Sequence, residues 1–188
     1  MSVLVDLALI HYPVLNKNKE IIGAAVTNLD IHDIARAGRT YGVGAFYIVT
    51  PYEDQKRLVE EIVSHWRSGY GATYNSDRKE ALEVVHVCSN LQELYEQVTV
   101  EGQRPAILAT SAQSSDAIIL SYPQVKEKIN QGNRILILFG TAWGLTDEVM
   151  EEVDAMLPPI SGGGSYNHLS VRSAVSIVLD RLLGNDRG

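Results

Sequence analysis

Five short apolar runs constrain the fold of this chain more than any other feature of its sequence. The clearest reads Arg-Ile-Leu-Ile-Leu-Phe over residues 134–139, and the others occupy residues 3–10, 45–49, 84–88 and 106–109. These runs are nearly continuous rather than alternating, which is typical of strands in a parallel sheet covered on both faces. Because helical patterns separate them, we expect an α/β fold with a mainly parallel sheet flanked by helices.

The segments between the runs predict the helices of this fold. Helices are expected over residues 30–41, 52–67, 91–98, 122–130, 147–150 and 171–183. Asp30 and Thr146 have the residue types that cap helix N-termini. Residues 69–77 (GYGATYNSD) predict a long loop. The 188 residues show no internal repeat and no linker, so a single domain over residues 1–188 is expected.

The composition is typical of a soluble cytoplasmic protein. The only cysteine, Cys88, lies in an apolar run and is predicted to be a buried, inert thiol, which fits a reducing cytoplasm. The first residues have no basic region of the secretory kind, and no window reaches the apolar length of a membrane helix, so no membrane role is expected. The formal net charge of -7 argues against binding nucleic acid through charge alone.

Small and polar residues follow three of the apolar segments, over residues 109–113, 139–145 and 158–168. In α/β sheets, ligands bind beyond the carboxyl ends of the strands. Glycines there let backbone groups approach a flat ligand, and Leu138, Leu157 and Ile160 could sandwich an aromatic ring. The pattern therefore favours an adenine site read by backbone hydrogen bonds between apolar side chains.

Other kinds of site lack their signatures. No Gly-Lys-Ser/Thr phosphate loop is present, and the first apolar run leads into His11-Tyr12-Pro13 rather than into the glycines of a dinucleotide-binding turn. The five histidines are scattered, so no metal site is expected. Ser170 lies near His168 without a Gly-x-Ser-x-Gly elbow, which argues against serine hydrolysis.

Several ordered motifs carry a resemblance to a known family. The segments 137–145 (ILFGTAWGL), 157–160 (LPPI) and 166–174 (YNHLSVRSA) resemble the paired C-terminal motifs of SPOUT RNA methyltransferases. Residues 30–43 are similar to the family's helix that presents an arginine ahead of a Gly-Val turn, although Asp30 stands where an asparagine is common. The resemblance spans nearly the whole chain. It is closest to a small bacterial stand-alone branch related to tRNA guanine-N1 methyltransferases.

The resemblance implies a fold, an activity and partners. The fold would be an α/β knot, in which the C-terminal segment forms a trefoil knot. The activity would be transfer of a methyl group from S-adenosylmethionine to a nucleotide of tRNA or rRNA, by a homodimer without metal. Residues 161–165 would let the chain turn around the cofactor, and a helix from Asn167 would lock the threaded tail.

The resemblance also assigns candidate residues. Arg36 would reach the target nucleotide, from the partner subunit, and Asn167, His168 and Arg172 would orient the acceptor. The predicted cofactor-binding residues are Thr110, Ser111, Leu138, Phe139, Gly140, Thr141, Gly144, Leu157, Pro158, Ile160, Gly162, Gly163, Asn167, Leu169 and Ser170. Asn167 is an equally good helix cap. Trp143 is expected in the core, with a wall of the adenine site as the alternative.

Two other functions remain open at this level. A non-catalytic RNA- or adenosine-binding module could keep the same pocket. A nucleotide hydrolase or oxidoreductase on an ordinary doubly wound sheet is disfavoured by the missing phosphate loop. Within the methyltransferase interpretation, a base nitrogen and a ribose oxygen are both open as the acceptor.

Overall fold

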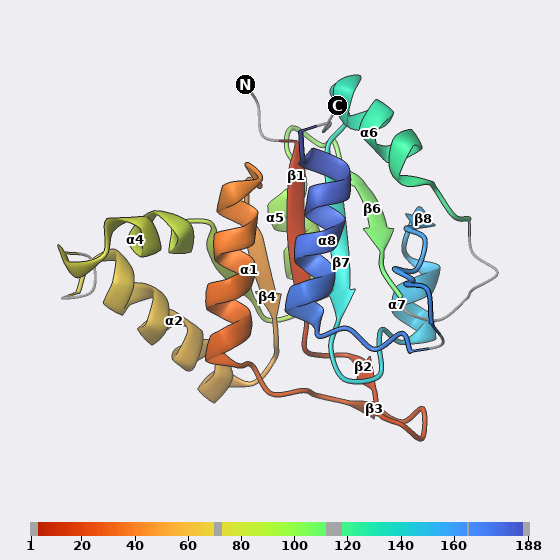
Figure 1. Cartoon of the computed structure of the whole chain (residues 1–188). Helices are drawn as coiled ribbons and strands as arrows, with labels where there is room; N and C mark the ends of the chain where they lie inside the picture. The colour runs from red at the N-terminus through yellow and green to blue at the C-terminus, as the bar shows by residue number, and fades with distance from the viewer. Residues whose placement is uncertain (1–3, 70–72, 112–117, 165, 186–188) are drawn as a thin grey trace.

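A six-stranded parallel sheet forms the centre of the molecule (Figure 1). The computed structural model describes residues 4–69, 73–111, 118–164 and 166–185. The strands lie in the order β5-β4-β1-β7-β6-β8. Their bounds are β1 Val5–Ile10, β4 Phe46–Val49, β5 Val85–Cys88, β6 Ala106–Ala109, β7 Ile135–Gly140 and β8 Ala155–Met156. All five predicted strands are thus confirmed, with bounds that differ by at most two residues.

The central strands β1 and β7 are buried on both faces, which explains why their apolar runs are continuous. Leu7 in β1 pairs with Phe46 of β4 on one side and with Ile137 of β7 on the other. Leu7 and Ile137 are both fully buried, as is Ala8, which points to the opposite face. Each face therefore carries its own apolar core, and both faces must be covered by helices.

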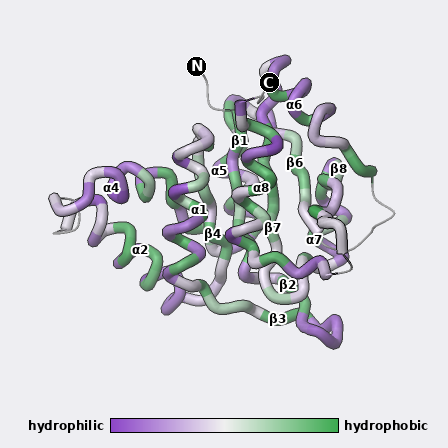
Figure 2. Tube along the Cα trace, viewed as in Figure 1, coloured by the Kyte–Doolittle hydropathy of each residue, from purple (hydrophilic) through white to green (hydrophobic). Residues whose placement is uncertain are grey.

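Helices cover the two faces unequally (Figures 1 and 2). One core lies between the sheet and α1, α2, α4, α6 and α8, and the other lies between the sheet and α5 and α7. The bounds are α1 Asn28–Thr40, α2 Glu53–Arg67, α4 Ser76–Leu82, α5 Leu91–Val98, α6 Tyr122–Asn130, α7 Asp147–Glu151 and α8 Val171–Leu183. The helix α8 packs on α1 and on β7, so the end of the chain lies over the middle of the sheet.

The predicted start of α1 and the proposed cap of the last helix are wrong, whereas the bounds predicted for α8 are confirmed. Thr27, not Asp30, caps α1, because the Thr27 hydroxyl accepts the hydrogen bond from the Asp30 backbone N–H. The Asp30 side chain faces Arg172 instead. Asn167 is not a cap either, since α8 begins at Val171 and Ser170 caps it. Thr146 caps α7, as predicted.

Two further elements were not predicted from the sequence. A short antiparallel hairpin joins β2 (Val14–Leu15) to β3 (Ile21–Ile22), and its tip is hydrophilic (Figure 2). The helix α4 begins inside the segment 69–77 that was predicted to be a loop, with Asn75 as its cap. Both elements bury few side chains, so neither leaves a strong apolar pattern.

Cys88 behaves as the sequence predicted. Its side chain is fully buried, and burial raises the pKa of its thiol to about 12. A thiol held in this protonated state is a poor nucleophile. Within the described segments, no helix combines the length and the apolar character that crossing a bilayer demands.

Candidate functional site

A cavity of about 820 Å³ opens at the carboxyl ends of β6 and β7. Its walls come from the loops after these two strands, from the segment between β8 and α8, and from the first turns of α8 and α1. The lining residues are Ala24, Ala25, Asp30, Thr110, Ser111, Tyr122, Phe139, Gly140, Thr141, Ala142, Trp143, Gly144, Pro158, Ile160, Asn167, His168, Leu169, Ser170, Val171, Arg172, Ala174 and Val178. The three strand-end segments predicted from the sequence therefore meet at one place.

The loop after β7 is held in a fixed shape. A Cβ on Gly140 would lie 2.9 Å from the Leu145 nitrogen and 3.0 Å from the Gly144 carbonyl carbon, so only glycine fits this close turn. Gly144 has φ +109°, which an L side chain rarely adopts. The Trp143 N–H donates to the Leu15 carbonyl at 3.0 Å, and the Leu15 N–H donates to the Gly144 carbonyl at 2.9 Å. The loop is thus tied to the β2–β3 hairpin.

Trp143 does not belong to the core, contrary to the expectation. Its side chain lines the cavity and remains 61% exposed. The backbone on both sides of Trp143 is held by the hairpin, and Ala142 has φ +52°. The loop therefore turns outward before the chain returns to the core at Leu145, which is 8% exposed.

Ion pairs and hydrogen bonds between charged side chains link α8 to α1 at the cavity. The Arg172 guanidinium donates to Asp30 at 3.0 Å, and its Nε lies 3.2 Å from Asp33. The Thr27 hydroxyl donates to the second oxygen of Asp30 at 2.6 Å. Asp30 is only 7% exposed, so its charge depends on these partners. The sequence analysis treated Asp30 as a helix cap and so missed its place in the cavity.

Most predicted site residues line this cavity. They are Thr110, Ser111, Phe139, Gly140, Thr141, Gly144, Pro158, Ile160, Asn167, His168, Leu169, Ser170 and Arg172. His168 is exposed and packs edge to face against Tyr166, with ring centroids 5.3 Å apart. Ala24, Ala25 and Tyr122 also line the cavity, but no motif in the sequence marked them.

Five predicted residues lie elsewhere. Leu138 and Leu157 are buried in the two cores, where the Leu138 carbonyl accepts from Thr110 and the Leu157 N–H donates to Ala109. Their backbone groups are thus used by the protein itself. Gly162 and Gly163 are exposed and lie outside the lining. Arg36 lies on the exposed face of α1, also outside the lining.

A buried histidine lies at the end of β1, behind the cavity wall. His11 is fully buried, and neither of its ring nitrogens has a hydrogen-bond partner within the described part of the chain. Burial lowers the pKa of His11 to about 4, while the nearby charge of Asp30 opposes this shift. His11 is therefore neutral at physiological pH.

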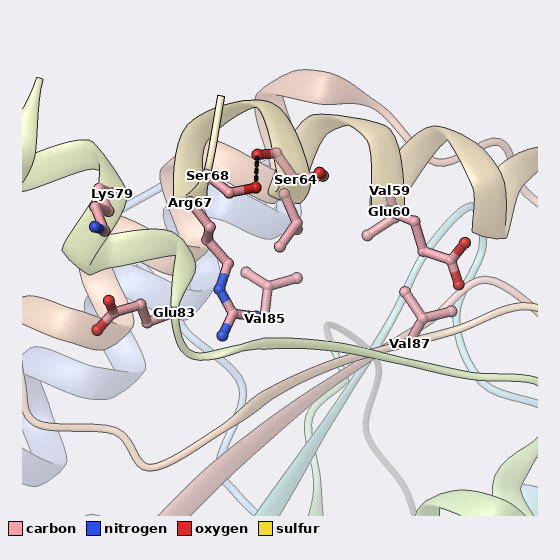
Figure 3. A pocket seen from close by; sticks show the side chains of 10 residues that line it. Val59, Glu60, Ser64, Arg67, Ser68, Lys79, Glu83, Val85 and Val87 are labelled. Atoms are coloured by element: carbon pink, nitrogen blue, oxygen red, sulfur yellow. Dashed lines mark hydrogen bonds between the residues drawn. The ribbon is translucent and has the colours of Figure 1, made fainter. Parts of the chain in front are cut away.

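A second cavity, of about 630 Å³, lies between α2, α4 and the edge strand β5 (Figure 3). Val59, Val85 and Val87 line it together with Arg67 and Glu83. It contains none of the strand-end loops and lies beside the strand farthest from β6 and β8 in the sheet. We therefore take the strand-end cavity as the candidate site.

Comparison with known proteins shows the family to which this chain belongs. The family model described as "SAM-dependent RNA methyltransferase", in which SAM is S-adenosylmethionine, matches residues 4–184. The tRNA (guanine-N(1)-)-methyltransferase of Oleidesulfovibrio alaskensis is 43% identical over 179 residues. That match covers 95% of this chain but 41% of the relative, so the chain spans less than half of that protein's length.

Two further proteins extend the comparison. An uncharacterized protein of Aquifex aeolicus is 37% identical over 185 residues, which are 97% of this chain and 90% of that protein. The SpoU methyltransferase AviRb of Streptomyces viridochromogenes has a similar fold, with a TM-score of 0.61 and 13% identity over 96% of this chain and 58% of that chain. The resemblance found in the sequence is confirmed, and the chain belongs to the family of SAM-dependent RNA methyltransferases.

Proposed function

We propose that this chain binds SAM in the strand-end cavity and transfers its methyl group to a nucleotide of tRNA or rRNA. The observation that carries the proposal is the convergence of three strand-end loops on one cavity in a member of this family. The volume of about 820 Å³ lies within the range of pockets that take small ligands and cofactors.

The walls of the cavity fit an adenosyl group. Ile160, Leu169 and Val171 offer apolar surface, and the glycines of the loop after β7 leave backbone groups accessible. Among the described lining residues there is no lysine, and the one arginine, Arg172, is held by two aspartates. This charge balance fits a cofactor with a positive sulfonium better than a polyphosphate.

The chain's own residues have defined tasks in such a transfer. SAM supplies an electrophilic methyl group, so the protein must align the acceptor and accept its proton. Asn167 and His168 would orient the acceptor at the cavity mouth, where the exposed His168 could pass a proton to water. Arg172 would act by position, because its ion pairs fix the first turn of α8 against α1.

The exposed position of Arg36 supports a homodimer. Arg36 lies on α1 outside the lining of its own cavity, so it would reach the cavity of a second copy. Leu29, on the same helix, is 61% exposed, which gives α1 apolar surface for a subunit contact. The guanidinium of Arg36 would hold a phosphate or a base of the RNA.

The path of the chain supports the trefoil knot. β8 lies at one edge of the sheet, yet α8 packs on α1 and β7 near its middle. Residues 157–164 and 166–170 therefore return across the carboxyl ends of β6 and β7, where we propose that the tail threads through its own chain. The family match over residues 4–184 supports one domain, and the buried thiol of Cys88 is compatible with a cytoplasmic location.

The relatives suggest tRNA as the first substrate to test. The Oleidesulfovibrio relative is named a tRNA (guanine-N(1)-)-methyltransferase, but more than half of it lies outside the match. Its named activity can therefore reside in either part. For this reason the proposal names the nucleic acid and leaves the modified atom to the experiment.

Cofactor binding and methyl transfer are tested separately. Calorimetry of the purified protein with SAM should show micromolar affinity, and the absence of both heat and thermal shift at millimolar SAM would contradict the proposal. Labelled methyl groups should then pass to total RNA from a strain that lacks the gene, and mass spectrometry of nucleosides would identify the product. Binding without transfer would favour the non-catalytic module.

The role of Arg36 gives the first mutational prediction. Arg36→Ala should lower methyl transfer roughly 100-fold, because the acceptor loses its alignment, while SAM affinity stays unchanged. Arg39→Ala is the matched control, since Arg39 lies on the same helix, is similarly exposed and pairs with Glu80. Equal loss of SAM binding and transfer in Arg36→Ala would contradict the role.

A further inference from the structure

We propose that Trp143 is a stacking platform for an unpaired base of the RNA substrate, placed at the mouth of the cavity. The inference rests on the proposed function insofar as it takes RNA as the substrate. It assigns the indole to the acceptor side of the site rather than to the cofactor. The ligand class is any unpaired nucleobase, either the target or its neighbour.

The exposure of Trp143 is the first observation. Tryptophan is highly buried on average, because its large apolar surface favours burial. In this chain 61% of Trp143 is exposed, beside the cavity that it lines. The core offered an alternative only a few residues away, where Leu145 and Val149 are buried. An exposed indole at this place is available to a ligand that arrives from solvent.

The rigidity of the loop is the second observation. The Trp143 N–H and the Gly144 carbonyl both bond to Leu15, and Gly140 admits no side chain without moving backbone atoms. The backbone that carries the indole is therefore fixed before any ligand binds. A preorganised aromatic surface loses little conformational entropy on binding, so stacking on it contributes more to affinity.

The surroundings of Trp143 fit a nucleobase. His168 and Leu169 line the same cavity, Leu169 is 47% exposed, and Tyr166 is 79% exposed and packs on His168. Exposed apolar and aromatic side chains thus line the cavity or pack against a residue that lines it. Proteins bind single-stranded RNA by stacking its bases on such side chains. With a formal net charge of -7, this chain gains less affinity from phosphates, so stacking must supply a larger share.

The test compares RNA affinity with SAM affinity in three variants. Trp143→Ala removes the platform, Trp143→Phe keeps an aromatic ring, and Tyr74→Ala is the control. Tyr74 is 78% exposed but lies outside the cavity lining. RNA affinity is measured on protein saturated with SAM, with bulk tRNA and with a short unstructured oligoribonucleotide as probes. Thermal melting confirms that each variant is folded.

Trp143→Ala should weaken RNA binding about 5- to 150-fold, the range that corresponds to loss of one stacked base. The RNA affinity of Trp143→Phe should stay within about threefold of that of the protein without substitutions, because a smaller ring still stacks. SAM affinity should be unchanged in both variants. Tyr74→Ala should leave both affinities unchanged.

Fluorescence gives a readout that does not depend on transfer. The chain has two tryptophans, so Trp66→Phe leaves Trp143 as the single reporter. Adding the oligoribonucleotide to this SAM-saturated variant should quench its fluorescence in a saturable manner, as expected when a base stacks on the indole.

Three results would overturn the inference. They are loss of SAM affinity in Trp143→Ala, unchanged RNA affinity in that variant, and RNA binding that leaves the fluorescence of Trp143 unaltered. Failure of the proposed function is recognised separately. In that case the protein without substitutions binds RNA but transfers no methyl group. The RNA affinities of the variants still decide the role of Trp143 in that case.

Discussion

The strand-end cavity and the cavity at β5 are built in different ways. The strand-end cavity is formed by loops, helix starts and buried charges, whereas the cavity at β5 lies between regular elements and has valines along α2 and β5. In the first, Arg172 pairs with the nearly buried Asp30. Near the second, Arg39 pairs with Glu80, and about half of each side chain is exposed to solvent.

This difference shows where the features that lower the stability of the protein lie. A buried ion pair, a histidine without a hydrogen-bond partner among the described residues and Ala142 at φ +52° all reduce the margin of stability. All three lie at or behind the strand-end cavity. The cavity at β5 has ordinary apolar packing with charges at its rim. Because backbone strain and buried polar groups lie at the strand-end cavity, they support this cavity as the functional site.

The largest expected difference concerns the two ion pairs. Arg172→Ala leaves the Asp30 charge buried without its main partner, so the free energy of unfolding should fall by roughly 3 kcal/mol and methyl transfer should be lost. Arg39→Ala should lower it by less than about 1 kcal/mol, because that pair is exposed. Denaturant unfolding measures both. Equal losses in the two variants would remove the contrast between the regions.

The buried His11 predicts a pH dependence that originates behind the strand-end cavity. Its pKa is about 4 in the folded protein, against 6.5 for a histidine in water, so the unfolded chain binds the proton first as pH falls. Stability should be fully present above pH 6.5 and should decline by up to about 3 kcal/mol toward pH 4. In His11→Leu this part of the decline should disappear, while a decline from His32 and His86 remains, because burial lowers the pKa values of these two histidines as well. A profile unchanged by the substitution would refute the assignment to His11.

Two glycines, Gly140 in the cavity lining and Gly163 outside it, offer a smaller, geometric contrast. Gly140→Ala should cost about 2 kcal/mol and weaken SAM binding, because its Cβ meets the backbone of Gly144 and Leu145. Gly163→Ala should change stability by less than about 0.5 kcal/mol, since nothing lies within 4 Å of its added Cβ. Thermal melting with and without SAM separates the two effects. A Gly163→Ala variant as damaged as Gly140→Ala would show that the close turn at Gly140 is not the cause.

The smallest effect is expected at the second cavity. Ser64→Phe places a ring into the space between α2 and β5. SAM affinity and methyl transfer should remain as in the unchanged protein, because this cavity is remote from the strand-end loops. A loss of SAM affinity with normal stability would make the cavity at β5 part of the functional site.

The strands and most helices were predictable because burial on both faces leaves long apolar runs. The meeting of the three strand-end loops also followed, since parallel strands bring their carboxyl ends to one edge. The hairpin at Val14 and the helix α4 were missed, because elements that bury few residues leave no such pattern.

Side-chain roles within the site were harder to predict. Trp143 was expected in the core from its apolar character, yet backbone ties to Leu15 hold its loop outward. Those ties join segments that lie far apart along the chain, which no local pattern contains. Asp30 resembled a helix cap, and its pairing with Arg172 depends on how α8 packs on α1.

The place of β1 has a consequence for synthesis on the ribosome. β1 ends at Ile10, but one of its two sheet partners, β7, begins only at Ile135. Until that point is translated, one edge of β1 has no strand beside it, and an open apolar edge invites pairing with other chains. Translation therefore has to pass Gly140 before the central sheet can close, and the candidate site assembles after that.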